Sequence, residues 1–424
     1  MADALKKTKP ALSLQTLKAG FHALGIRNYR LYWIGQLISL CGTWMQTTAQ
    51  AWVVYSLTNS PMALGTVTTL QFLPIMFLSL FGGVMADRVP KRKVVFITQT
   101  AALIQATLFG LLVATGLIQV WHIYILAFLQ GIINAVDNPV RQAFAAELVS
   151  RDDRANAIAL NSMLFNAARI VGPALAGILI AKTGASTALF LNAASFLAII
   201  IAIGMMDTSA FFNQAGLQKR MSPMQELAEG LRYTWHTPAV LIVMLVVGFI
   251  GTFGYNFSVV LPLLGGFVLH TDAVGFGELS AALGIGSCIG ALAAAFWQRI
   301  SLRWLLLSSA GFSLFLGAVA LSTHLWLSNL LLVILGFFGV MFSTNAATVI
   351  QVTVPDHLRG RVTSLYFLLF AGSTPIGAFL IGTLSTKFNV TDALLICAAL
   401  CLLGVVYSAL YERFVIERRA VQVA

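Results

Sequence analysis

Three charged side chains lie inside stretches that are otherwise apolar. A charge in such a stretch is costly, which indicates a functional or structural role. Asp137 and Arg141 are one helical turn apart, so the two side chains can pair within a helix. A carboxylate in such surroundings either latches elements together or binds and releases a proton. Arg169 follows Asn161 and Asn166 and needs either a structural partner or an anionic ligand.

Polar residues also recur at steps of three and four in the first, fourth, seventh and tenth apolar stretches. That spacing places them on one helix face, which either lines a shared cavity or bonds helix to helix. Nearby aromatic residues would make such a cavity suitable for an amphipathic ligand. The candidate cavity residues are Gln36, Thr43, Gln46, Thr47, Gln50, Gln130, Asn134, Arg169, Thr252, Tyr255, Asn256, Asn345, Thr348 and Gln351.

The elements that carry these residues are predicted to be membrane-spanning helices. Hydrophobic residues make up 58% of the chain and charged residues 10%, well below the quarter that is typical of soluble domains. A spanning helix needs about 20 mostly apolar residues. The predicted spans are 31–56, 62–86, 94–116, 121–141, 157–181, 187–206, 239–264, 274–297, 303–321, 326–350, 362–385 and 392–411.

The distribution of basic residues predicts how these helices are oriented. With both termini in the cytoplasm, 23 of the 26 Lys and Arg residues lie on the cytoplasmic side, and the outer loops hold only Lys182 and Lys387. This bias is what the positive-inside rule describes. The net charge of +11 therefore reflects membrane orientation, and no nucleic acid partner is expected.

A long polar interval divides the chain into two halves that resemble each other. At an offset of 205 residues, Arg154 matches Arg359, Phe165 matches Phe370, Gly172 matches Gly377, and Gly177 matches Gly382. Repeated halves around a central site are a transporter architecture. The predicted divisions are a cytoplasmic arm at 1–29, a six-helix bundle at 30–207, a cytoplasmic linker with a short surface helix at 208–237, a second bundle at 238–412 and a cytoplasmic tail at 413–424.

The loop after the second span carries the motif GVMADRVPKRK, which contains Gly83, Asp87, Arg88, Lys91 and Arg92. This spacing resembles motif A of the major facilitator superfamily. The resemblance implies a charge network that latches the two halves in the outward-facing state. The second-half copy has lost its acidic position, where Ala294 stands, so no such latch is expected there.

The fifth span reads NAARIVGPALAG and resembles motif C, which marks the drug:proton antiporter branch and implies export through Gly172, Pro173 and Gly177. The fourth span departs from motif B, because Ala127 stands where that motif has an Arg. The stretches NYRLYWIGQLISLCGTWMQ and DNPVRQAFAAELVSRDDRANAIALNS resemble the bacterial branch of enterobactin exporters and macrolide efflux proteins.

We therefore expect an all-α membrane protein of the major facilitator fold, with twelve helices in two pseudo-symmetric bundles, in the bacterial inner membrane. Its expected work is export of a drug, macrolide or siderophore-like molecule by alternating access, with protons as coupling ion and Asp137 and Arg141 as coupling site or latch. A lipid or lysolipid translocator and an importer or facilitator remain alternatives. No enzyme activity, cofactor or metal is expected. The protein is expected to be a monomer whose partners are its substrate and the membrane lipids.

Overall fold

The computed structural model describes residues 21–88, 90–212, 223–296 and 301–423, with side chains except at 79–88, 223–227, 295, 356–357 and 415–423. The N-terminal half follows a short helix, η1 (His22–Gly25), and consists of six long helices. These are α2 (Arg27–Thr58), α3 (Pro61–Arg88), α4 (Lys91–Ala114), α5 (Val120–Glu147), α6 (Arg154–Thr183) and α7 (Ala185–Gly204).

The C-terminal half follows η2 (Thr208–Ala210) and the linker helix α8 (Pro223–His236). We call each run of helical segments that would span the membrane once a rod. The first rod of this half, from α9 to η4, changes between α-helical and π-helical winding, and its fifth rod is broken between α14 and α15. The elements are α9 (Pro238–Phe249), η3 (Ile250–Gly254), α10 (Phe257–Leu263), η4 (Leu264–Val268), α11 (Ala273–Phe296), α12 (Leu302–Leu321), α13 (Leu325–Thr353), α14 (Asp356–Ala371), α15 (Thr374–Lys387) and α16 (Val390–Val423).

Eleven helical runs of the described residues are long and apolar enough to cross a membrane. The broken rods each count once, as Pro238–Val268 and Leu358–Lys387. The twelfth rod is α2, which has 32 residues but a polar composition that includes three glutamines. The all-helical membrane fold expected from the sequence is confirmed. Residues 413–423, which the sequence analysis expects to form a cytoplasmic tail, continue α16 as helix.

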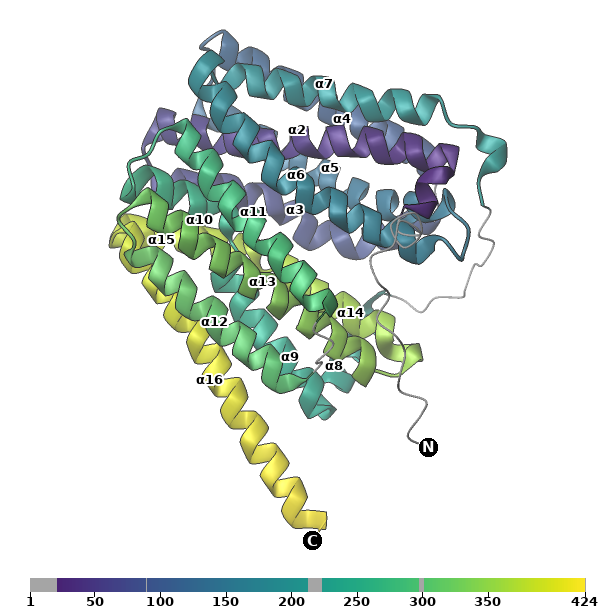
Figure 1. The fold of residues 1–424 in the computed structure, drawn as a ribbon, viewed down its shortest axis with the longest axis vertical. Coiled ribbons are helices and arrows are strands. Elements are labelled where there is room, and N and C mark those ends of the chain that lie inside the picture. Colours follow the sequence, from purple (N-terminus) through teal and green to yellow (C-terminus); the bar gives the residue numbers. More distant parts are fainter. Residues whose placement is uncertain (1–20, 89, 213–222, 297–300, 424) are drawn as a thin grey trace.

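The two halves form separate bundles that lie side by side, the first coloured purple to teal and the second from the teal of α8 and α9 through green to yellow (Figure 1). The linker helix α8 and the first residues of α2, α6 and α14 lie at one end, which we call the linker end. The opposite end, where α2 turns into α3 at Asn59 and α6 turns into α7 at Gly184, is called the far end.

The resemblance between the halves has a counterpart in their packing. Gly172 of α6 packs against α2, because a Cβ atom there would lie 2.6 Å from the Cβ of Trp44. Its partner in the repeat, Gly377 of α15, packs in the same way against the carbonyl of Thr252 in η3. In both halves, therefore, a glycine lets the fifth rod approach the first rod without a side chain between them.

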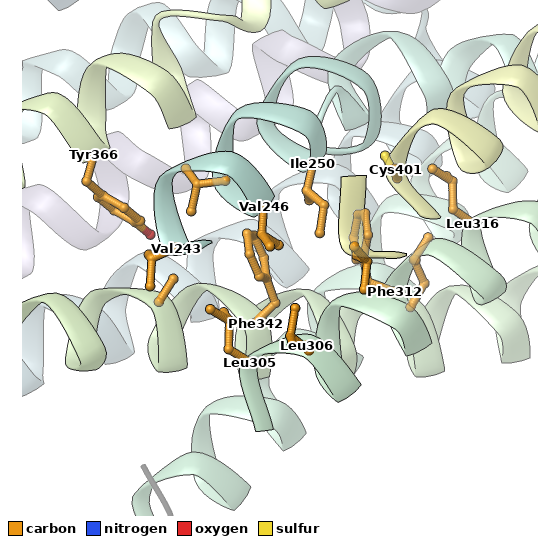
Figure 2. Close-up of a cluster of buried hydrophobic side chains, with 14 of the residues drawn as sticks. Val243, Val246, Ile250, Leu305, Leu306, Phe312, Leu316, Phe342, Tyr366 and Cys401 are labelled. Carbon is orange, nitrogen blue, oxygen red and sulfur yellow. The ribbon is translucent and has the colours of Figure 1, made fainter. Parts of the chain in front are cut away.

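Hydrophobic side chains fill the space between the helices of the C-terminal half. Figure 2 shows Phe312, Phe342 and Ile250 in this cluster, and all three are fully buried. The ring of Tyr255 stacks on Phe312 with centroids 5.8 Å apart. This packing fixes the position of Tyr255, which faces the other half.

The halves touch each other mainly from the middle of the rods to the far end. Gly65 of α3 and Gly382 of α15 meet there, and a Cβ on Gly65 would lie 2.7 Å from the carbonyl of Ala378. Tyr55 Oη donates to the carbonyl of Gly266 (3.0 Å), and Gly177 lies against the first residues of α11. Recorded hydrogen bonds between the described parts of the two halves start at Tyr55, Thr69, Arg169 and Thr383.

Candidate substrate cavity

A cavity of about 360 Å³ lies between the two halves, which is large enough for part or all of a drug-sized molecule. The N-terminal half contributes residues of α2 and α6, and the C-terminal half contributes residues from η3 to α14. The lining residues are Trp44, Thr47, Thr48, Ala51, Phe165, Arg169, Pro173, Tyr255, Phe257, Ser258, Leu261, Pro262, Phe276, Ser280, Leu283, Ser343 and Phe370.

Aromatic rings make up much of the cavity wall. Trp44 and Phe165 meet edge to face with centroids 5.7 Å apart on the N-terminal side. On the C-terminal side Tyr255 contacts Phe257 at 5.1 Å and Phe370 at 4.8 Å. Rings that brace one another in this way present flat apolar surfaces in fixed positions, which suits the planar or hydrocarbon part of a ligand.

The hydroxyl groups of the wall are mostly engaged by their own helices. Thr47 donates to the carbonyl of Thr43 (3.1 Å), Thr48 to that of Trp44 (3.3 Å), and Ser280 to that of Phe276 (3.2 Å). A hydroxyl whose proton is used in this way offers only its lone pairs to a ligand. The charged hydrogen-bond donor among the described lining residues is the guanidinium of Arg169.

Arg169 reaches across the interface from α6 to α11. Its Nη1 donates to Ser287 Oγ at 3.3 Å, and its guanidinium carbon lies 6.0 Å from the ring centroid of Trp44. Ser287 in turn donates to the carbonyl of Leu283 (2.9 Å). The positive charge thus has a neutral hydroxyl and an aromatic face as its recorded partners.

The structure brings Thr47, Arg169 and Tyr255 of the candidate residues to the cavity. The amides of α2 turn instead toward other helices of the same half. Gln46 donates to Gln105 of α4 (3.2 Å) and accepts from Asn192 of α7 (2.6 Å). Gln50 donates to Gln71 of α3 (3.2 Å). These residues bond helix to helix, which is the alternative that the sequence left open.

The remaining candidates lie outside the cavity lining. Gln36 is buried, and Gln351 is exposed at the end of α13. The others bond along their own helices: Thr43 to Ser39, Gln130 to Asn134, Thr252 to Gly248, Asn256 to Thr252, Asn345 to Met341 and Thr348 to Thr344.

Sequence reasoning missed Phe165, Phe276 and Phe370 as cavity residues. Phenylalanine is common on lipid-facing and packed helix surfaces alike, so its type alone carries no signal. One signal existed, because Phe165 and Phe370 are partners in the 205-residue repeat and both line the cavity.

Asp137 lies away from the cavity, buried between α4 and α5 with an exposed fraction of 2%. Its Oδ2 pairs with Nε of Arg141 at 3.1 Å. Its Oδ1 accepts hydrogen bonds from Thr98 Oγ1 (2.6 Å) and Gln99 Nε2 (3.1 Å). Both oxygens of the carboxylate are therefore satisfied by donors from within the N-terminal half.

The described part of motif A also binds within its own half. Lys91 pairs with Glu147 of α5 (2.7 Å), and Arg92 donates to the carbonyl of Ile203 at the end of α7 (2.9 Å). The side chains of Asp87 and Arg88 lie outside the described part of the structure, as do the surroundings of Gly83. In motif C, Gly172 contacts α2, while the Pro173 carbonyl and Gly177 face α11.

Asp153 stands between α5 and α6 at the linker end. Hydrogen bonds from His22 (2.7 Å) and Ser150 (2.8 Å) hold the pKa of this carboxyl below its ordinary value, with the contribution of His22 the larger. The contact ties the first described residues of the chain to the start of α6.

A second hollow of about 350 Å³ is an apolar groove on the C-terminal half. It lies where the linker helix α8 meets α9 and α14. The groove is lined by Leu231, Thr234, Trp235, Leu241, Met244, Leu245, Gly248, Phe249, Phe253, Leu365 and Leu369.

Comparison with known families identifies the group to which this architecture belongs. The family of transmembrane secretion effectors, a branch of the major facilitator superfamily, matches residues 18–421. The chain belongs to this family. Its members are transporters, so this protein is a membrane transporter and not an enzyme.

Relatives of this protein include transporters of different small molecules. The Staphyloferrin A transporter of Staphylococcus aureus is 24% identical over 89% of this chain and 95% of its own length. The multidrug efflux pump Tap of Mycolicibacterium fortuitum is 27% identical over 86% and 91%. The enterobactin exporter EntS of Citrobacter koseri is 24% identical over 85% and 86%.

Solved structures share the fold of this protein at low sequence identity. A bacterial homologue of the human lysosomal transporter Spinster superposes with a TM-score of 0.72 at 14% identity, over 91% of this chain and 96% of that one. A POT family transporter superposes with a TM-score of 0.73 at 10% identity, with the same coverage. The likeness establishes the major facilitator fold.

Proposed function

We propose that this protein is a secondary active transporter that exports an amphipathic small molecule by alternating access, driven by the proton gradient. The observation that carries the proposal is the aromatic cavity between the two halves, to which both halves contribute walls. A ligand in that position is enclosed by one half moving against the other. We propose a monomer, surrounded by membrane lipids, as the working unit.

We assign the linker end to the cytoplasm, because it collects almost all of the Lys and Arg residues of the chain. In this orientation the contacts of Gly65, Tyr55 and Gly177 close the cavity toward the outside. The arrangement then corresponds to the inward-facing state, in which a substrate enters from the cytoplasm or the inner leaflet. Lys91 and Arg92 bond within their own half, as is expected when a latch of the outward-facing state is released.

The direction of transport is supported by the relatives. The names of Tap and EntS describe efflux and export, and their likeness extends over most of this chain. We propose the same direction here, with a drug, macrolide or siderophore-like molecule as substrate and the bacterial inner membrane as location.

We propose Asp137 as the proton-coupling residue, because it is the buried carboxylate among the described residues. Protonation would remove the charge that holds Arg141, Thr98 and Gln99. Loss of these bonds loosens α4 against α5 near the linker end. Proton binding thereby changes how the N-terminal half packs at its linker end. This end is the part of the molecule that must close over the cavity.

The test is transport in proteoliposomes under an imposed pH gradient, with lipophilic dyes, macrolides and siderophores as substrates. The Asp137→Asn variant is compared with Asp152→Asn, which removes an exposed carboxylate near the linker end. We expect gradient-driven movement in the wild type and in Asp152→Asn, and a loss of at least tenfold in Asp137→Asn. Unchanged pH dependence in Asp137→Asn would refute coupling at this residue, and movement that ignores the gradient would refute proton-driven export.

A lipid or lysolipid translocator is the second candidate, and the apolar groove beside α8 is the observation that favours it. A hydrocarbon chain fits a groove lined in this way better than a polar solute does. Fluorescent phospholipid and lysolipid in the same proteoliposomes separate the two functions. Leaflet exchange of these lipids without dye or siderophore transport would favour translocation of lipid.

A further inference from the structure

The described residues that line the cavity carry positive charge and no negative charge. Arg169 is the charged residue of its lining, and no Asp or Glu occurs among the lining residues that the structure describes. A cationic substrate would lose its hydration shell there without meeting a carboxylate, which is unfavourable. A neutral substrate would leave the guanidinium without a counter-charge.

The guanidinium has unused capacity for an anion. It carries five N–H donors, and one hydrogen bond to a described side chain, that to Ser287, is recorded. Charge at bilayer depth is costly unless it is paired or hydrated, so its retention needs a compensating role. Its fork of donors matches the geometry of a planar oxyanion such as a carboxylate.

The surroundings of Arg169 specify the rest of the ligand. Trp44 lies under the guanidinium, and Phe165 braces Trp44 from the side. Across the cavity stand Tyr255 and Phe370. A molecule with an oxyanion at Arg169 therefore places its remaining body between rings from both halves, so this body should be aromatic or otherwise flat and apolar.

The position of Arg169 also links binding to movement. Its bond to Ser287 joins α6 of one half to α11 of the other. The next turn of α11 packs closely, since a Cβ on Gly284 would lie 2.7 Å from Ile170. An anion that takes the donors of Arg169 competes with Ser287 and so weakens a bond between the halves.

We propose that the cavity selects amphipathic organic anions, with Arg169 binding the oxyanion and the aromatic walls binding the apolar body. This inference rests on the proposed function, since it names the substrate class of the same site. The selectivity for anions distinguishes this cavity from one that binds cationic drugs. The shared chemistry is a compact oxyanion on an aromatic frame, whether carboxylate, sulfonate or phenolate.

The experiment uses two dyes with the same aromatic frame. 8-Anilinonaphthalene-1-sulfonate carries a sulfonate, and N-phenyl-1-naphthylamine lacks it. Binding of each to the purified full chain in detergent is measured by calorimetry, for wild type, Arg169→Gln, Arg169→Lys and the control Lys182→Gln at the exposed far end of α6. Thermal unfolding checks that each variant is folded.

We expect the sulfonate to bind wild type and Lys182→Gln at least about tenfold more tightly than the uncharged dye, as one charge-assisted hydrogen bond allows. Arg169→Gln should lose this preference and keep its affinity for the uncharged dye, while Arg169→Lys keeps part of the preference. Equal binding of the two dyes by wild type, or an undiminished preference in Arg169→Gln, would overturn the inference. If Arg169→Gln does not fold, the ranking of wild type against Arg169→Lys decides in the same way.

Transport of the two dyes separates this inference from the proposed function. Movement of the uncharged dye without preference for the sulfonate would leave export standing and refute anion selection. Preferential binding of the sulfonate without gradient-driven movement of either dye would support anion recognition and refute proton-driven export.

Discussion

At the scale of single residues, the stability of the N-terminal half depends on the group around Asp137. The carboxylate is buried and accepts from Thr98 and Gln99 while it pairs with Arg141. Removal of one member of a buried pair leaves the other charge uncompensated, which in soluble proteins costs about 3–5 kcal/mol. The two charges should therefore show strong coupling in stability.

The prediction is tested with a double-mutant cycle of Asp137→Asn and Arg141→Gln. We expect each single variant to lower the unfolding temperature clearly, and the double variant to be less destabilised than the sum of the two, because no charge remains unpaired. Unfolding of purified protein in detergent is the measurement. Additive effects would mean that the two side chains do not stabilise each other.

Some residue roles could be predicted from the sequence and others could not. Helical spacing placed Gln46 and Thr47 on one polar helix face, but it could not indicate which of the two side chains lines the cavity. The answer depends on partners that are remote in sequence, such as Asn192 for Gln46. Arg169 was predictable, because a charge in an apolar stretch is costly and therefore informative.

At the scale of elements, Gly172 sets how closely α6 approaches α2. A Cβ there would lie 2.6 Å from the Cβ of Trp44 and 2.7 Å from the carbonyl of Cys41. Gly172→Leu should force the helices apart, displace Trp44 from the cavity and lower transport at least tenfold, while the protein still inserts. Gly204→Leu, where no atom lies within 4 Å of the added Cβ, is the matched control.

The assay for these variants is transport of a dye that the wild type moves, normalised to the amount of inserted protein. Full activity of Gly172→Leu would show that close approach of the two helices is dispensable. An equal loss in Gly204→Leu would mean that any added bulk in a spanning helix disturbs the protein.

The ends of most helices could be predicted, whereas irregularities within them could not. A proline in an apolar stretch permits a bend without requiring one, since α6 runs through Pro173 unbroken while the chain breaks between α14 and α15 just before Pro375. Similarly, no sequence pattern from Ile250 to Gly254 indicates that these residues form a π-helix. Such features depend on which neighbouring groups satisfy the displaced backbone bonds, and this is a property of the assembled bundle.

At the scale of the whole molecule, closure at the far end and separation at the linker end should alternate. Spin labels on Arg151→Cys and Gln351→Cys report the linker end, and labels on Lys182→Cys and Lys387→Cys report the far end. Both pairs are placed in a background without Cys41, Cys288, Cys397 and Cys401.

We expect substrate to shorten the linker-end distance and lengthen the far-end distance, and acidic pH without substrate to reverse both changes, because an exporter driven by inward proton flow returns in its protonated form. Double electron–electron resonance is the measurement. Adding Gly382→Leu should enlarge the far-end distance without substrate, because a side chain there would meet Gly65 and Pro61. Distances that change at one end only would contradict rocking of two rigid halves.

The polar character of α2 has a consequence for the time course of biosynthesis. This helix is made before the chain segments that satisfy its glutamines, namely α3 for Gln50 and α4 and α7 for Gln46. Asn192 follows Gln46 by 146 residues, which a ribosome needs roughly 7–30 s to translate. During that interval the side-chain amides of the nascent helix lack their final hydrogen-bond partners. We expect the insertion machinery to cover this polar surface until those partners are made.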